Sequence, residues 1–272
     1  MDRAYLSIID WPEGTDEGWR TGALSHATGL DAFNARQAVR RGIPLVVSMM
    51  VTDRAAAAVR ALEQAGVSAF APTRTQLAGV KPAVEISRVI PTADESRFVV
   101  ERPDGAAAEL RLDRVFLVVR AVLKFKARVV TDNEIVSYDE DSGVIGIDWS
   151  GGGGTRSQVV TTEVVELHTM KGQRIRVDMR RLDEKPLGLD TLAPHRERAD
   201  ILTELFMVGA KHAMLDLGFK RFRIPPDLLQ RSRKAGTQEG FAVSTFDGGI
   251  PFEFYSVWTQ IMHRRMLGLD AS

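Results

Sequence analysis

The amino-acid sequence predicts an α+β fold, with a small β-α-α-β-α-β domain followed by an antiparallel-sheet domain closed by C-terminal helices. Helical and extended patterns alternate through the first 80 residues, short strand patterns with tight turns fill the middle of the chain, and helical patterns dominate its last part. A chain of 272 residues is also long enough for two hydrophobic cores. We therefore expect domains at residues 3–80 and 84–270.

The first domain combines three strands with three helices. Gly29 and Gly42 end the first two helical stretches, because glycine is the usual residue just after the last helical turn. The run IPLVVSMMV is continuous and apolar, which is typical of a buried strand. The expected elements, in order, are a strand at 4–11, helices at about 16–28 and 30–41, a strand at 43–51, a helix from about Thr52 to Gly66 and a strand at 67–72.

Two segments of this domain, LDAFNARQAVRRGIPLVV and TDRAAAAVRALEQAGVSAFAP, carry a resemblance to known families. With their element order, residues 3–80 resemble, at fold level, the domain shared by the C-terminal part of the bacterial ribosomal stalk protein and the ClpS-like adaptor of the Clp protease. Both families bind proteins, so the resemblance implies an interaction domain. The acidic residues with which the adaptor grips an N-terminal amine have no counterpart here. The rest of the chain resembles uncharacterised bacterial proteins, which implies no function.

The second domain begins with short strands and ends with helices. Asp104-Gly105 predicts a tight hairpin, because its turn needs a positive φ that glycine adopts without steric cost. Met170-Lys171-Gly172 predicts a second hairpin. The expected strands are at 84–90, 96–103, 106–112, 113–125, 159–169, 173–180 and 240–246, and the expected helices are at about 196–217, 225–234 and 252–267.

The charges are balanced overall but segregated along the chain. The sequence has 36 basic and 36 acidic residues, yet residues 131–155 hold six acidic residues and no basic one, and they include four successive glycines. One interpretation is a solvated loop between strands, since like charges repel and glycine orders poorly. The other is a contact arm for a basic partner, with Asp139, Glu140, Asp141 and Trp149 as the candidate contact residues.

A basic segment follows the predicted helix 196–217. Its six basic residues are interleaved with Phe219 and Phe222, so it could bind a phosphate-rich partner, either a nucleic acid or an anionic membrane surface. The alternatives are a half-buried connection with solvated charges, or pairing with the acidic loop. The candidate binding residues are Lys220, Arg221, Arg223, Arg231, Arg233 and Lys234.

Local motifs for catalysis fail throughout the chain. The absence of cysteine excludes thiolate chemistry and cysteine-based zinc sites. The five histidines lack metal-ligand spacing, the glycine cluster is followed by Thr155-Arg156 where a nucleotide-binding loop needs Lys-Ser/Thr, and no serine sits in G-x-S-x-G. We therefore expect no metal, no cofactor and no catalytic residue. An enzyme whose site is assembled from distant residues remains an alternative.

These observations favour a non-enzymatic protein–protein interaction or regulatory module, with a protein partner. The longest stretch without a charged residue, Gly42 to Thr52, has eleven residues, short of the roughly 20 that a transmembrane helix needs. The N-terminal residues MDRAYLSIID do not resemble a secretory signal, so we expect a cytoplasmic protein. The sequence does not specify the identity of the partner or the oligomeric state.

Overall fold

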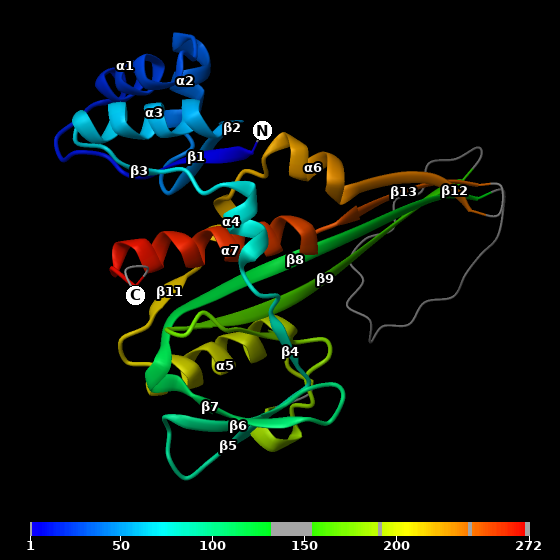
Figure 1. The fold of residues 1–272 in the computed structure, drawn as a ribbon. Helices are drawn as coiled ribbons and strands as arrows, with labels where there is room; N and C mark the ends of the chain where they lie inside the picture. Colours follow the sequence, from blue (N-terminus) through cyan, green and yellow to red (C-terminus); the bar gives the residue numbers. More distant parts are fainter. Residues whose placement is uncertain (1, 132–153, 190–191, 239–240, 270–272) are drawn as a thin grey trace. The chain divides into compact units, whose positions relative to one another are not determined.

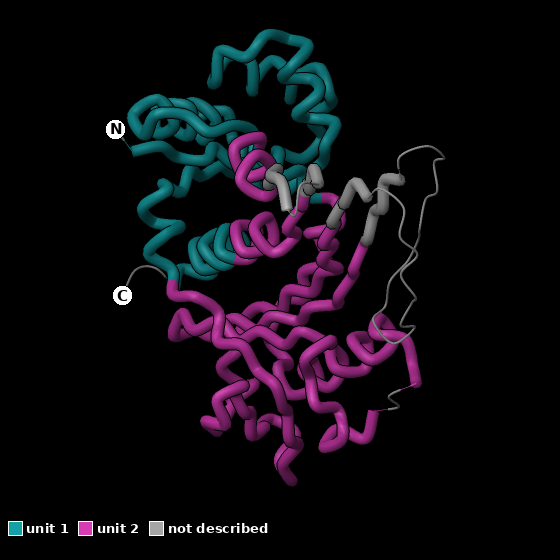
Figure 2. The backbone as a smooth tube through the Cα atoms, turned by 90° about the vertical axis from the view of Figure 1, so that its right-hand side faces the viewer, with its two compact units in different colours: residues 1–80, 222–225, 257–272 teal, residues 81–221, 226–256 magenta. Residues whose placement is uncertain are grey.

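The computed structural model describes residues 2–131, 154–189, 192–238 and 241–269, and they form the α+β fold that the sequence predicts (Figure 1). The chain divides into two compact units (Figure 2). Unit 1 comprises residues 1–80, 222–225 and 257–272, and unit 2 comprises residues 81–221 and 226–256.

Unit 1 contains an antiparallel sheet in the strand order β2-β1-β3. Its elements follow the predicted order β-α-α-β-α-β. Acidic side chains begin the first two helices, because Asp16 accepts a hydrogen bond from the backbone N–H of Trp19 and Asp31 accepts one from that of Asn34. The elements are β1 (Arg3–Asp10), α1 (Glu17–Thr28), α2 (Ala32–Val39), β2 (Leu45–Val51), α3 (Thr52–Gln64), β3 (Ser68–Phe70) and α4 (Arg74–Gly79).

Both faces of this sheet are covered within unit 1. On one face, Leu6 of β1 packs into an apolar core that it shares with α1, α2 and α3. On the other face, Trp258 stacks on Phe70 with the ring centroids 6.0 Å apart, and its Nε1 donates a hydrogen bond to Ser7 Oγ at 2.9 Å. Trp258 belongs to α7 (Gly249–Met266), whose residues up to 256 are part of unit 2 and whose later residues are part of unit 1.

The apolar run that the sequence assigns to a buried strand forms β2, and the prediction is wrong about its surroundings. Within the described residues β2 pairs with β1 alone and is an edge of the sheet. The reason is topological: the chain crosses β1 through α3, so β3 pairs with β1 on the opposite side. Residues 47–50 are half-buried, and Val51 is 39% exposed.

Unit 2 is built on a seven-stranded sheet in the order β12-β13-β8-β9-β10-β4, with β11 beside β8. Its centre is antiparallel, as predicted, whereas β4 pairs with β10 and β11 pairs with β8 in parallel. The strands are β4 (Val84–Ile86), β8 (Val115–Thr131), β9 (Gly154–Thr169), β10 (Arg174–Asp178), β11 (Met214–Asp216), β12 (Arg233–Gln238) and β13 (Phe241–Asp247).

A second, three-stranded sheet and a helix complete unit 2. The small sheet consists of β5 (Arg88–Pro91), β6 (Arg97–Glu101) and β7 (Ala107–Arg111). Helix α5 (His195–Gly209) packs Phe206 against Val165 and other residues of the main apolar core, on one face of the larger sheet. The opposite face of β9 and β10 therefore carries the alternate side chains of these strands.

The two tight hairpins are confirmed, and both use a glycine with positive φ. Gly105 has a φ of 81° between β6 and β7, and Gly172 has a φ of 79° between β9 and β10. Because the turns are tight, they set the register of the strands that they join.

The helix predicted at 196–217 is shorter than expected. It ends at Gly209, whose backbone lies so close to the Glu95 carbonyl oxygen that a Cβ there would be 2.4 Å from it. Residues 214–216 instead form β11, because their backbone pairs with β8. Leu217, the last residue of the predicted helix, is exposed.

The helix predicted at 225–234 is also shorter, because α6 (Pro226–Ser232) gives way to β12. The sequence pattern did not indicate β12 as a strand. Its antiparallel pairing with β13 forms it, which is a contact beyond the local pattern.

Candidate functional site

A cluster of buried charged side chains lies in unit 2, on the face of β9 and β10 opposite α5. Glu166 and His168 alternate along β9 with residues of the apolar core, so they point to the other face. The hairpin register places Arg176 of β10 opposite Glu166 and Arg174 opposite His168. A glutamate and a histidine of β9 thus face two arginines of β10 across the hairpin.

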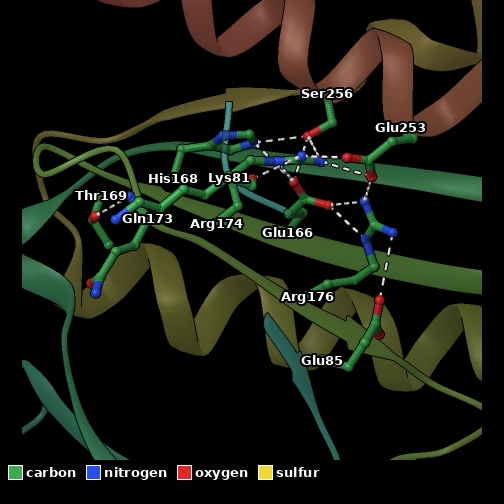
Figure 3. A network of polar contacts seen from close by, with 10 residues as sticks. All are labelled: Lys81, Glu85, Glu166, His168, Thr169, Gln173, Arg174, Arg176, Glu253 and Ser256. Carbon is green, nitrogen blue, oxygen red and sulfur yellow. Dashed lines mark hydrogen bonds and ion pairs between the residues drawn. The ribbon is translucent and has the colours of Figure 1, made fainter. Parts of the chain in front are cut away.

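The first half of α7 supplies the remaining members of the cluster. Glu253 and Ser256 are three residues apart, so both lie on one face of the helix and reach the same pair of strands (Figure 3). The Arg174 guanidinium bridges the two elements, because its Nε donates to Glu166 at 2.7 Å and its two terminal nitrogens donate to the Glu253 carboxylate at 2.5 and 3.0 Å. This bidentate contact ties α7 to β10.

Glu166 is the centre of the cluster. Its fully buried carboxylate accepts hydrogen bonds from Arg174, from Arg176 Nε at 2.6 Å and from Ser256 Oγ at 2.5 Å. Arg176 also donates to Glu253 at 2.6 Å, and its guanidinium lies 5.0 Å from the centroid of the Phe252 ring. Two carboxylates therefore neutralise two guanidiniums in a region without solvent around Glu166.

The charges keep these carboxylates ionised. Burial alone raises the pKa of Glu166, but the positive charge of Arg176, together with the neighbouring His168 and Arg174, lowers it below its ordinary value. Burial likewise opposes the shift at Glu253, where hydrogen bonds and charge from the same arginines bring the pKa down to about 2. The pKa values of both arginines are raised despite burial.

The cluster contains a serine beside a histidine, and its geometry is not that of an activated nucleophile. Ser256 Oγ lies 3.2 Å from His168 Nε2, yet the hydroxyl donates its single hydrogen to Glu166. His168 Nε2 is therefore the donor in this contact, whereas a serine nucleophile needs that nitrogen to accept the hydroxyl proton. Ser256 is also fully buried. The cluster fastens α7 to the sheet, and it supports no nucleophilic chemistry.

None of these residues was predicted as a site residue, although the sequence carries a signal for them. Charged residues occupy alternate positions in the two strands that flank the predicted Met170-Lys171-Gly172 turn. Folding the strands about Lys171 brings Glu166 opposite Arg176. The contribution of α7 has no such local signal, since Glu253 is 77 residues from Arg176 along the chain.

The predicted basic segment is exposed. Lys220 and Arg221 end a 3₁₀ helix at Gly218–Arg221, Arg223 follows it, Arg231 lies in α6 and Arg233 begins β12. These five side chains are exposed, and none forms an ion pair with another residue that the structure describes. Lys234 lies in β12, but its side chain is outside the described part.

The aromatic rings beside the basic segment are half-buried and pack against other aromatic rings. The Phe219 ring centroid lies 5.3 Å from that of Phe252 and 5.4 Å from that of Tyr255, and that of Phe222 lies 6.1 Å from that of Trp258. These contacts do not favour stacking of the two phenylalanines on unpaired bases of a nucleic acid.

Asp139, Glu140, Asp141 and Trp149 all lie within residues 132–153, outside the described residues. The interpretations of the acidic loop, as a solvated loop, as a contact arm or as a partner of the basic segment, stay predictions.

The edge strand β2 is the remaining candidate for a functional site. Its sequence, LVVSMMV, has no charge and no proline. A β-bulge interrupts its pairing with β1 at Val47, so the straight part runs from Ser48 to Val51. Over this part Met49 lies opposite Tyr5, and Met50 lies opposite Ala4. The side of β2 away from β1 has no strand partner among the described residues.

No three His, Asp or Glu side chains among the described residues are placed to hold a metal ion. Of the helices that the structure describes, none has both the length and the apolar character that crossing a membrane requires. Protein-family models, curated proteins and solved structures give no match to this chain, and the resemblance of residues 3–80 stays a prediction.

Proposed function

We propose that this chain is a protein-interaction module that accepts an extended strand of a protein partner along the free side of β2. The observation that carries the proposal is the position of an uncharged, apolar seven-residue strand at the edge of a sheet. Backbone N–H and C=O groups on an unpaired edge are a template for another strand, and pairing of this kind is a recurring mode of protein recognition.

The composition of β2 supports this function because it lacks the usual protection of an edge. Natural edge strands carry lysine, proline or inward-pointing charges that discourage pairing, and β2 has none of these. Only the bulge at Val47 interrupts it, and four straight residues remain beyond the bulge. The opposite edge, β3, has three residues and offers a shorter template.

Added backbone hydrogen bonds and buried side chains would stabilise the complex. Each new backbone hydrogen bond contributes about 0.5–1.5 kcal/mol. Val51 is 39% exposed and Met49 is half-buried, so a neighbouring strand can remove further apolar surface from water. Affinity then comes from the main chain, and specificity comes from the side chains on either face.

Site-specific photo-crosslinking tests the proposal. A benzophenone amino acid replaces Val51 in the full chain, and the matched control carries it at Phe33 of α2, which is 69% exposed in the same unit. In a cell lysate, we expect crosslinks from position 51 that map to one extended segment of a protein and that are lost when Met49→Lys adds a charge to the edge. Equal crosslinking from the two positions, or crosslinks that Met49→Lys leaves unchanged, would refute the proposal.

The exposed basic side chains favour a second candidate function, binding of a phosphate-rich surface through unit 2. The observation is that Lys220, Arg221, Arg231 and Arg233 are exposed and form no ion pair with any described residue. Binding to a DNA duplex or to phosphatidylserine vesicles should fall steeply with salt and weaken when these four residues are neutralised. Absence of binding to both probes at low salt contradicts this function.

A further inference from the structure

We propose that the strand that pairs with β2 is the β2 of a second copy of this chain, so that the protein forms a two-fold symmetric dimer through a continuous sheet. This inference rests on the proposed function, because it requires β2 to accept a strand, and it names the partner. The dimer would join the three strands of unit 1 to the same three strands of the second copy. Sheets of this size are common, whereas three-stranded sheets with two free edges are small.

The chemistry of β2 matches a copy of itself. A two-fold interface places the same surface on both sides, so any charge near the axis would face its own like charge. No residue of β2 is charged, and self-pairing therefore brings apolar side chains together without electrostatic repulsion. A partner strand with charged residues would find no opposite charge on β2 to recognise it.

The alternation of side chains determines where the axis can lie. Residues directly opposite each other in a sheet point to the same face. A two-fold axis perpendicular to the sheet must therefore place one residue of β2 directly opposite the same residue of the second copy. The bulge at Val47 reverses the alternation on its far side, which restricts regular pairing to Ser48–Val51. Two residues of this part, Met49 and Met50, have a regularly paired neighbour on each side. Met50 packs against the apolar core of unit 1, so we place the axis at Met49, where Ser48 meets Met50 of the second copy.

The contacts around this axis are compatible in size and polarity. Met49 lies on the face that Tyr5 shares, opposite Met49 of the second copy. Methionine is unbranched and flexible, so two facing thioethers can adapt to each other. Pairing of β2 with the β3 of another copy is less favourable, because β3 is short and because a head-to-tail contact does not close into a dimer.

Sedimentation equilibrium of the full chain measures the dimer directly. Across about 1–200 µM, a range suited to a small interface, the average mass should rise from 30.0 kDa toward twice that value. Met49→Lys and Met49→Glu should each weaken self-association about tenfold or more, because like charges meet on the axis and two methionines lose their apolar contact. An equimolar mixture of the two variants should restore the dimer, because opposite charges then meet.

Two controls keep the test decisive. Phe33→Lys adds a charge to an exposed position of the same unit and should leave the average mass unchanged. If either Met49 variant loses its fold by circular dichroism, the benzophenone probe at Val51 replaces it, in a mixture of ¹⁴N- and ¹⁵N-labelled chains. Mixed-isotope crosslinks from position 51 to β2 then identify a contact between copies.

The outcomes separate this inference from the function on which it rests. A chain that stays at 30.0 kDa, or a dimer that survives both charged variants, overturns the inference. If the chain is monomeric and position 51 crosslinks to a segment of a different protein, the inference fails and the proposed function stands. If the chain is monomeric and position 51 crosslinks to nothing, both fail.

Discussion

Replacing Glu166 with glutamine would keep the size of the side chain and remove the charge on which two buried arginines depend. The carboxylate accepts hydrogen bonds from Arg174, Arg176 and Ser256 in a fully buried position. The amide oxygen of glutamine could keep part of this set, but its NH₂ group would face a guanidinium, donor against donor. Loss of one partner from a buried ion pair costs about 3–5 kcal/mol. Because Glu253 still neutralises the arginines, we expect the lower end, about 3 kcal/mol.

Hydrogen–deuterium exchange is the assay, because it reports the stability of separate segments. A loss of about 3 kcal/mol should speed exchange in β9, β10 and the start of α7 by roughly a hundredfold where exchange follows local opening. Urea unfolding followed by tryptophan fluorescence complements it. Three of the four tryptophans, Trp11, Trp19 and Trp258, belong to unit 1, so fluorescence reports mainly that unit, while far-UV circular dichroism reports both units.

Glu204→Gln in α5 is the matched control, because Glu204 is exposed in the same unit and forms no ion pair with a described residue. It should change the free energy of unfolding by less than about 0.5 kcal/mol. The reasoning fails if Glu166→Gln and Glu204→Gln give the same exchange rates in β10. The same reasoning predicts that adding Arg176→Met restores part of the stability lost in Glu166→Gln. Removing both partners leaves fewer uncompensated buried charges than removing one.

Three further predictions concern acidity, packing and a buried hydrogen bond. Because the pKa of Glu253 falls from an ordinary 4.5 to about 2 on folding, its contribution to stability is complete above about pH 5 and is lost as the pH falls toward 2. The shift corresponds to about 3.4 kcal/mol, which the 43% exposure of the side chain reduces to about 1 kcal/mol. Urea titrations between about pH 6 and 2.5 should therefore show a smaller loss of stability on acidification in Glu253→Gln than in the unchanged protein. Gly209→Ala should destabilise unit 2 by about 1–3 kcal/mol, because the new Cβ would lie 2.4 Å from a backbone oxygen, whereas Gly22→Ala, with nothing within 4 Å, should stabilise α1 by up to about 1 kcal/mol in the same thermal denaturation assay. Ser7→Ala should cost about 1–3 kcal/mol by leaving Trp258 Nε1 without its acceptor, and fluorescence-detected urea unfolding would expose an error if the midpoint does not move.

Some features of the candidate sites could be predicted from the sequence, because they depend on residues that are close together along the chain. The basic segment is exposed as a run of charges suggests, and the hairpin at Gly172 determines which charged residues of β9 and β10 face each other. The arrival of Glu253 and Ser256 could not be predicted in this way. Their helix meets the strands through contacts about 80 to 90 residues apart, and no spacing in the sequence encodes that approach.

The sequence by itself determined the order β-α-α-β-α-β, the two glycine hairpins and the C-terminal helix, because periodicity, caps and positive-φ turns act over a few residues. Only the tertiary structure decided that α5 ends at Gly209, that β11 and β12 join the sheet, and that the apolar run of β2 lies at an edge. The physical reason is that hydrophobicity indicates which residues avoid water, while strand pairing decides which side of a strand remains open. For β2 that difference turns a strand predicted to be buried into an edge strand, whose outer side has no strand partner among the described residues.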